Sequence, residues 1–151
     1  MRFSVASVGL LLMFSLPCAR AFAGGDEALD AASLANLEAR AEHAAAREQC
    51  FLYTELVHDY VEVAGKQMAA GDMESATASL KRVQAYAEHI HAGLAKDTKR
   101  VKNAEMLVHL TAFHLSQLMH LISSEDEAVL QATLKQLNKV HDELLAQVFA
   151  H

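Results

Sequence analysis

The sequence predicts an all-α protein, an antiparallel up-down four-helix bundle with an elongated, Ala-rich first helix. Three observations predict this class. The chain of 151 residues contains one Pro and six Gly, so few points force a helix to end. Apolar residues recur at alternating spacings of three and four, as they do along one face of a helix. Short polar connections separate these segments, which makes successive helices antiparallel neighbours.

The first 23 residues have the pattern of a secretory signal peptide. Arg2 gives a positive start, an apolar stretch runs from Val5 to Leu16, and Ala21-Phe22-Ala23 matches the pattern that precedes a cleavage site. The stretch is shorter than the about 20 residues of a membrane-spanning helix, so we expect no stable membrane anchor after cleavage. A lipid anchor at Cys18 is the weaker alternative. The predicted location is extracytoplasmic, either periplasmic or secreted.

The segment that follows predicts one long first helix. No Pro interrupts residues 28–70, which as a helix would be roughly 60 Å long and would overhang its partners. The predicted organisation is therefore a signal peptide over 1–23, an Ala-rich helical extension over 24–46 and a bundle domain over 47–151. We expect the extension to contact a second copy or another protein, or else to be a solvent-exposed linker. The residues assigned to that contact are Leu34, Leu37, Ala41 and Ala44.

Residues 72–93 predict the second helix. Asp72 is suited to cap its start, while Gly71 and Gly93 are suited to end helices in the left-handed conformation. The turn and the residues after it resemble the centre of a tetratricopeptide repeat, but no second copy follows at a period of about 34 residues, so no family is assigned. The apolar face consists of Met73, Ala76, Leu80, Val83, Ala87, Ile90 and Leu94.

Two further helices complete the predicted bundle. Ser124 and Glu127 form a capping box at the start of the last one. The face of the third helix consists of Val101, Val108, Ala112, Leu115, Met119 and Ile122. The face of the fourth consists of Leu130, Leu134, Leu137, His141, Leu144 and Val148.

Charge and cysteine content exclude several function classes. The net charge of −6 becomes −8 when Arg2 and Arg20 leave with the signal peptide, so we expect no binding to nucleic acid. Cys50 is then the single free thiol, which excludes an internal disulfide and suggests a small buried apolar residue. The chain has no Gly-rich phosphate loop and no nucleophile elbow. We therefore predict that the protein is not an enzyme.

The nine histidines are the residues best suited to chemistry. His141 interrupts an apolar face, and a buried imidazole needs a polar partner. Counting along the helices from their connections places Glu105 and His91 level with it, with Tyr53 nearby. One interpretation is a hydrogen bond from His141 to Glu105 or Tyr53 that fixes helix register. The other is a divalent metal site, for zinc or copper, made by His91, Glu105 and His141.

Two functions therefore remain as expectations. The leading one is a secreted or periplasmic, non-enzymatic helical protein that acts through protein–protein interaction, with a homodimer or protein partner bound by the N-terminal helix. The alternative is an extracytoplasmic metal-binding helical protein that uses the His/Glu layer.

Overall fold

The structure, a computed structural model, describes residues 24–94, 98–123 and 127–150. The predicted signal peptide and Ser124 lie outside these residues. The described chain contains five α-helices and a short 3-10 turn, η1, but no strand, so the all-α class is confirmed while the predicted count of four helices is not. The helices are α1 (Gly24–His43), α2 (Ala46–Ala69), α3 (Met73–Gly93), α4 (Val101–Leu118) and α5 (Glu127–Ala150), and η1 spans Met119–Leu121.

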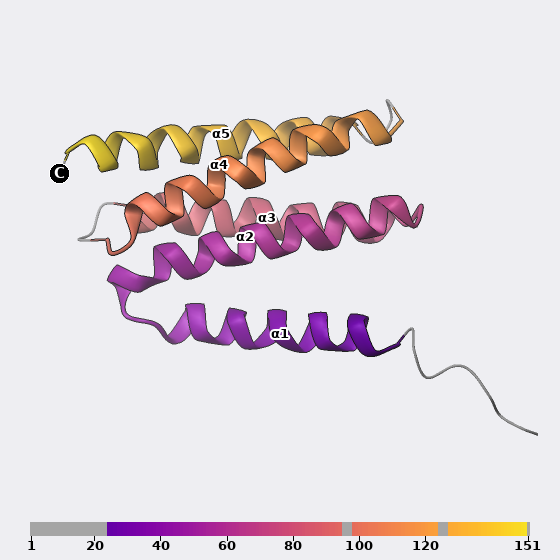
Figure 1. The fold of residues 1–151 in the computed structure, drawn as a ribbon, viewed down its shortest axis with the longest axis horizontal. Coiled ribbons are helices and arrows are strands. Elements are labelled where there is room, and N and C mark those ends of the chain that lie inside the picture. The colour runs from indigo at the N-terminus through magenta and orange to yellow at the C-terminus, as the bar shows by residue number, and fades with distance from the viewer. Residues whose placement is uncertain (1–23, 95–97, 124–126, 151) are drawn as a thin grey trace, which may run out of the picture.

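Two helical hairpins lie side by side (Figure 1). Helix α2 packs against α3 to form one hairpin, and α4 packs against α5 to form the other. Because every connection reverses the chain, α2 runs parallel to α4 and α3 runs parallel to α5 where the hairpins meet. Helix α1 covers the free side of α2 as an additional layer.

The prediction of one elongated first helix is wrong, because the chain bends between α1 and α2. Ala45 has an extended backbone, with φ −60° and ψ 141°. The side-chain Nε2 of Gln49 then donates hydrogen bonds to the carbonyl oxygens of Ala41 at 3.1 Å and Glu42 at 3.4 Å. These carbonyls belong to the last turn of α1, where they lack helical partners. The capped α1 folds back on α2 and buries Leu37 and Ala41 instead of overhanging.

The predicted apolar faces of the other helices form the core. The alternating spacing places one row of side chains per helix against its neighbours, and most members of these rows are buried. Met73, Val101, Met119, Ile122 and Leu134 are partly buried against the core. The α5 row also includes Thr133, whose hydroxyl donates to the Val129 carbonyl oxygen at 2.7 Å. Fully buried members include Leu80, Val83 and Ile90 on α3, Val108 and Leu115 on α4, and Leu130, Leu137 and Leu144 on α5.

The start of α3 agrees with the sequence prediction, whereas its end at Gly93 does not. The Asp72 carboxylate accepts a hydrogen bond from the Ser75 amide at 3.1 Å, and Gly71 has φ 78°, both as predicted. Gly93 is not a left-handed cap, because Gly71 is the one described glycine with positive φ. A Cβ at Gly93 would lie 3.6 Å from the Cβ of Cys50, an ordinary van der Waals contact, so packing does not require a glycine there. The left-handed residue before α4 is Arg100, with φ 61°.

Candidate functional site

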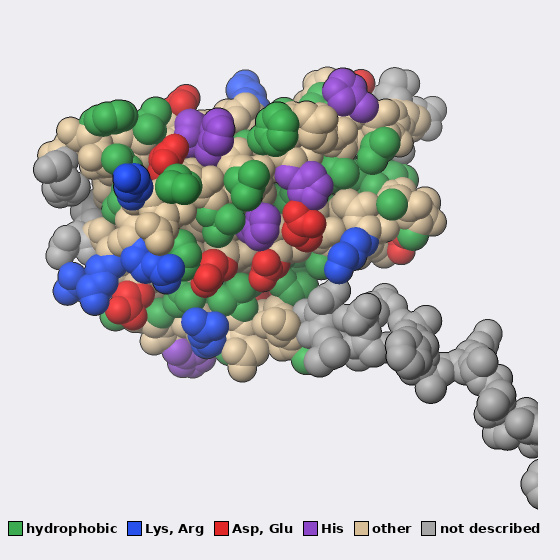
Figure 2. Space-filling view, viewed as in Figure 1, with side chains coloured by type: hydrophobic (Ala, Val, Ile, Leu, Met, Phe, Trp, Pro, Cys, Tyr) green, Lys and Arg blue, Asp and Glu red, His purple; other side chains and the backbone are tan. Residues whose placement is uncertain are grey.

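The outward face of α4 carries three large apolar side chains that do not contribute to the core. Met106, Leu110 and Phe113 are 60%, 54% and 59% exposed. Their spacings of four and three place them on one helix face, opposite the buried Val108 and Leu115. Figure 2 shows hydrophobic side chains, with histidines among them, on the face over α4. We call Met106, Leu110 and Phe113 the α4 stripe.

An apolar hollow adjoins the α4 stripe where α4 passes the start of α2. It has a volume of about 340 Å³ and is lined by Phe51, Asn103, Met106, Leu107 and Leu110. Phe51 also lines a neighbouring hollow of about 540 Å³, which has several basic side chains. The second hollow is lined by Arg40, His43, Ala44, Glu48, Phe51, Leu52, Lys99 and Arg100.

Arg100 lines the larger hollow in a strained conformation and lies over Phe51, which the two hollows share. Its guanidinium carbon lies 3.5 Å from the centroid of the Phe51 ring, a cation–π contact. Its φ of 61° is costly for a residue with a Cβ, and such strain concentrates at functional positions. Beside it, the Lys99 ammonium lies 3.3 Å from Glu48 Oε1. One end of the α4 stripe is therefore basic.

The structure brings together two of the three residues predicted as a His/Glu layer. His141 Nε2 lies 2.9 Å from Glu105 Oε1, and their side chains are 19% and 16% exposed. His91 is not part of this pair, because its Nδ1 contacts Glu143 Oε2 at 2.7 Å between α3 and α5. The ring beside His141 is that of His109, with centroids 5.0 Å apart. Within the described ranges, no three His, Cys, Asp or Glu side chains are placed to hold a metal ion.

Two other histidines join α2 to α4 beside the α4 stripe. His114 Nδ1 lies 2.6 Å from Glu62 Oε1, and His58 Nδ1 lies 3.0 Å from Thr111 Oγ1. These contacts fix the parallel register of the two helices. Neither pair has a local spacing in the sequence that would identify it.

A third cluster, which we call the Glu38 clamp, attaches α1 to α2 and α3. Glu38 Oε1 accepts hydrogen bonds from the hydroxyls of Tyr60 and Tyr86, each at 2.6 Å, and from Arg82 Nη1 at 2.8 Å. Burial raises the pKa of Glu38, but these bonds and the Arg82 charge outweigh it, so the pKa lies below its ordinary value. Burial and the bond to Glu38 raise the pKa of Tyr86 to about 12.

The tyrosines of the clamp belong to an aromatic row. The rings of Tyr53 and Tyr86 have centroids 5.8 Å apart, and so do those of Tyr60 and Tyr86. The His89 ring stacks on Tyr53 with centroids 4.6 Å apart. All three tyrosines of the sequence lie in this row.

The four residues predicted to bind a partner lie at the contact of α1 with the rest of the chain. Leu37 and Ala41 are buried, and Leu34 is partly buried against the core. Ala44 is half-buried at the bend. In this structure these residues therefore serve an intramolecular contact.

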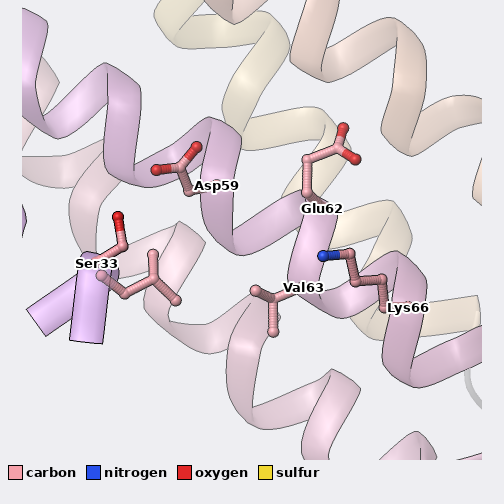
Figure 3. Close-up of a pocket in the computed structure, with 6 residues that line it drawn as sticks. Ser33, Asp59, Glu62, Val63 and Lys66 are labelled. Atoms are coloured by element: carbon pink, nitrogen blue, oxygen red, sulfur yellow. The ribbon is translucent and has the colours of Figure 1, made fainter. Parts of the chain in front are cut away.

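A polar hollow of about 220 Å³ shows that this contact is incomplete (Figure 3). Asp59, Glu62, Val63 and Lys66 of α2 line it, with Ser33 opposite on α1. The hollow also borders Leu34, so one side of that apolar side chain lacks close neighbours. Helix α1 therefore packs less tightly there than at Leu37.

Cys50 is an inert packing residue in this arrangement. Its side chain is free and fully buried. Burial raises the pKa of its thiol to about 11, far above the range in which a thiolate nucleophile forms.

The chain matches no protein-family model, and it has no significant match among curated proteins or solved structures. Among the described residues, no helix combines the length and hydropathy that crossing a membrane requires.

Proposed function

We propose that this is a secreted or periplasmic, non-enzymatic helical protein that binds another protein through the α4 stripe. One observation carries the proposal: three large apolar side chains are more than half exposed on one helix face and border an apolar hollow. Single exposed apolar residues are normal on protein surfaces, whereas adjacent ones beside a hollow are typical of interaction sites. The proposed surface thus moves from α1, where the sequence placed it, to α4.

The chemistry of the surface suggests the kind of segment it binds. The hollow beside Phe51 and Leu107 has room for one large apolar side chain, which would anchor a segment lying along α4. Arg100 and Lys99 at its basic end favour a carboxylate. An amphipathic helix with an acidic residue about one turn beyond its anchor satisfies both requirements.

Replacing Leu110 by Asp is expected to reduce partner binding at least tenfold without unfolding the protein. The change places a charge in the centre of the contact, while Leu110 is more than half exposed in the free chain. The measurement is retention of proteins from an extracytoplasmic extract on the immobilised mature chain, compared between wild type and variant. Phe149→Ser is the matched control, because Phe149 is 81% exposed and lies outside the α4 stripe. Equal retention by Leu110→Asp and wild type would exclude the α4 stripe as the site.

Metal binding is a second proposal, supported by the contact between Glu105 and His141. Glu105 and His109 are four residues apart on α4, so they share a face, and the His109 ring lies beside that of His141. A zinc or copper site here requires side-chain rotations, because the three side chains are not placed to hold an ion as they stand. His109 then takes the place that the sequence gave to His91.

Equilibrium dialysis of the untagged protein against Zn²⁺ tests this second proposal. His141→Ala is expected to weaken binding at least tenfold, since it removes one of three ligands. His91→Ala is expected to leave binding unchanged, because His91 pairs with Glu143 instead. No zinc retained by the wild type, or equal losses in both variants, would reject a site at Glu105, His109 and His141.

A further inference from the structure

We propose that α1 is exchangeable between copies: the chain forms a domain-swapped dimer in which α1 of each copy docks on α2 and α3 of the other. In that dimer the Glu38 carboxylate of one copy accepts the hydrogen bonds of Tyr60, Arg82 and Tyr86 in its partner. Each clamp is then completed by a residue from the second chain.

The bend between α1 and α2 is built from residues that favour a straight helix. Ala44, Ala45 and Ala46 lie there, and Ala has the highest helix propensity of any residue. Ala45 stands at the N-cap of α2 but its methyl side chain makes no capping hydrogen bond, so the Gln49 side chain is the one that bridges the bend. Rotating its ψ from 141° toward the helical value would turn the chain toward one continuous helix, as the sequence pattern predicts. Straightening adds helical hydrogen bonds at the bend and carries α1 away from its own α2.

The docking surface left behind is complementary to α1 of a second copy, because it carries the partners of Glu38. Its apolar part is small over the described side chains of α1, residues 31–43, where Leu37 and Ala41 are the buried ones. Recognition therefore depends on Glu38, which brings a negative charge to Arg82 and an acceptor to two tyrosine hydroxyls. The Glu38 contacts can form within or between chains, whereas straightening replaces the Gln49 hydrogen bonds to Ala41 and Glu42 by helical ones. Exchange therefore costs mainly the entropy of association. A hollow lined by Leu34 lies between α1 and α2, so this end of the contact is less closely packed.

Ala45→Pro distinguishes the bent monomer from the domain-swapped dimer. The φ of −60° at Ala45 is the value that a Pro ring requires, so the bent chain tolerates the change. A Pro inside a continuous helix disfavours that helix by more than a hundredfold. Sedimentation of the mature wild-type chain over a concentration series is expected to show a dimer that grows with concentration. Ala45→Pro is expected to stay monomeric, with its dimer dissociation constant raised at least a hundredfold and its circular dichroism unchanged.

A mixing experiment tests whether Glu38 crosses between chains. Glu38→Arg places like charges together at Arg82, and Arg82→Glu does so at Glu38, so neither variant alone is expected to dimerise. Mixed in equal amounts they are expected to form a heterodimer, because one of its two clamps pairs native Glu38 with native Arg82. Two results would overturn the proposal: a wild type that remains monomeric at millimolar concentration, or an Ala45→Pro dimer as tight as that of the wild type. A dimer abolished by Leu110→Asp but kept by Ala45→Pro would also overturn it, by assigning self-association to the α4 stripe.

Discussion

Leu115→Ala is expected to lower the free energy of unfolding by about 3 kcal/mol, whereas Phe113→Ala is expected to change it by less than about 1 kcal/mol. Both residues lie on α4, two positions apart. Leu115 is fully buried between the two hairpins, so its truncation leaves a cavity. Phe113 is 59% exposed, and its truncation mainly removes apolar surface from water. Urea unfolding followed by far-ultraviolet circular dichroism measures both values.

Comparing the losses in unfolding free energy of Leu115→Ala and Phe113→Ala decides whether the α4 stripe is free for binding. Leu110→Ala is a second substitution on the stripe and is expected to behave like Phe113→Ala, since Leu110 is 54% exposed. A loss at Phe113 as large as that at Leu115 would mean that Phe113 packs inside the protein, and the α4 stripe would then lose its proposed role.

The helices and core of the two hairpins could be predicted because their signals are local. The spacing that buries Leu80, Val83 and Ile90 is complete within 21 residues of α3. The bend before α2 could not be predicted in this way. It depends on the Gln49 side chain capping α1 and on Glu38 meeting Tyr86, which is 48 residues away in the sequence. Helix propensity alone favours the straight helix that the sequence suggested.

The candidate site likewise has features that local sequence signals predict and features that they do not. Counting residues from the connection between α4 and α5 placed Glu105 level with His141, and the two side chains do meet. This count gives the level of a residue along the helix axis, but it does not give the side of α5 that faces α3. It therefore placed His91 beside His141, whereas His91 contacts Glu143. The α4 stripe did have a local signal: Met106, Leu110 and Phe113 repeat at helical spacing outside the predicted core face. A helix with apolar residues on two faces needs either a second layer of the same chain or a binding partner.

Acidification is expected to release α1 from α2 and α3 while the two hairpins keep their helical structure. The pKa of Glu38 lies below its ordinary value of 4.5. A lowered folded-state pKa means that this carboxylate stabilises the docked form fully above about pH 4.5 and loses that effect as the pH falls through the folded-state value. Once protonated, Glu38 no longer attracts Arg82 and is a poorer acceptor for Tyr60 and Tyr86. Docking then depends on the buried Leu37 and Ala41, the partly buried Leu34 and the Gln49 hydrogen bonds at the bend. This is a small apolar contact for a 20-residue helix.

Because the sequence contains no Trp and all three tyrosines lie in the aromatic row, tyrosine near-ultraviolet circular dichroism reports directly on this contact. The tyrosine signal is expected to change below pH 4.5 before the far-ultraviolet signal does. Glu38→Gln is the control, since its neutral amide still accepts a hydrogen bond but does not titrate. Its docking is expected to be weaker by about 2 kcal/mol at neutral pH and to lack the acid transition. An unchanged transition in Glu38→Gln would show that the acid sensitivity does not come from the Glu38 clamp.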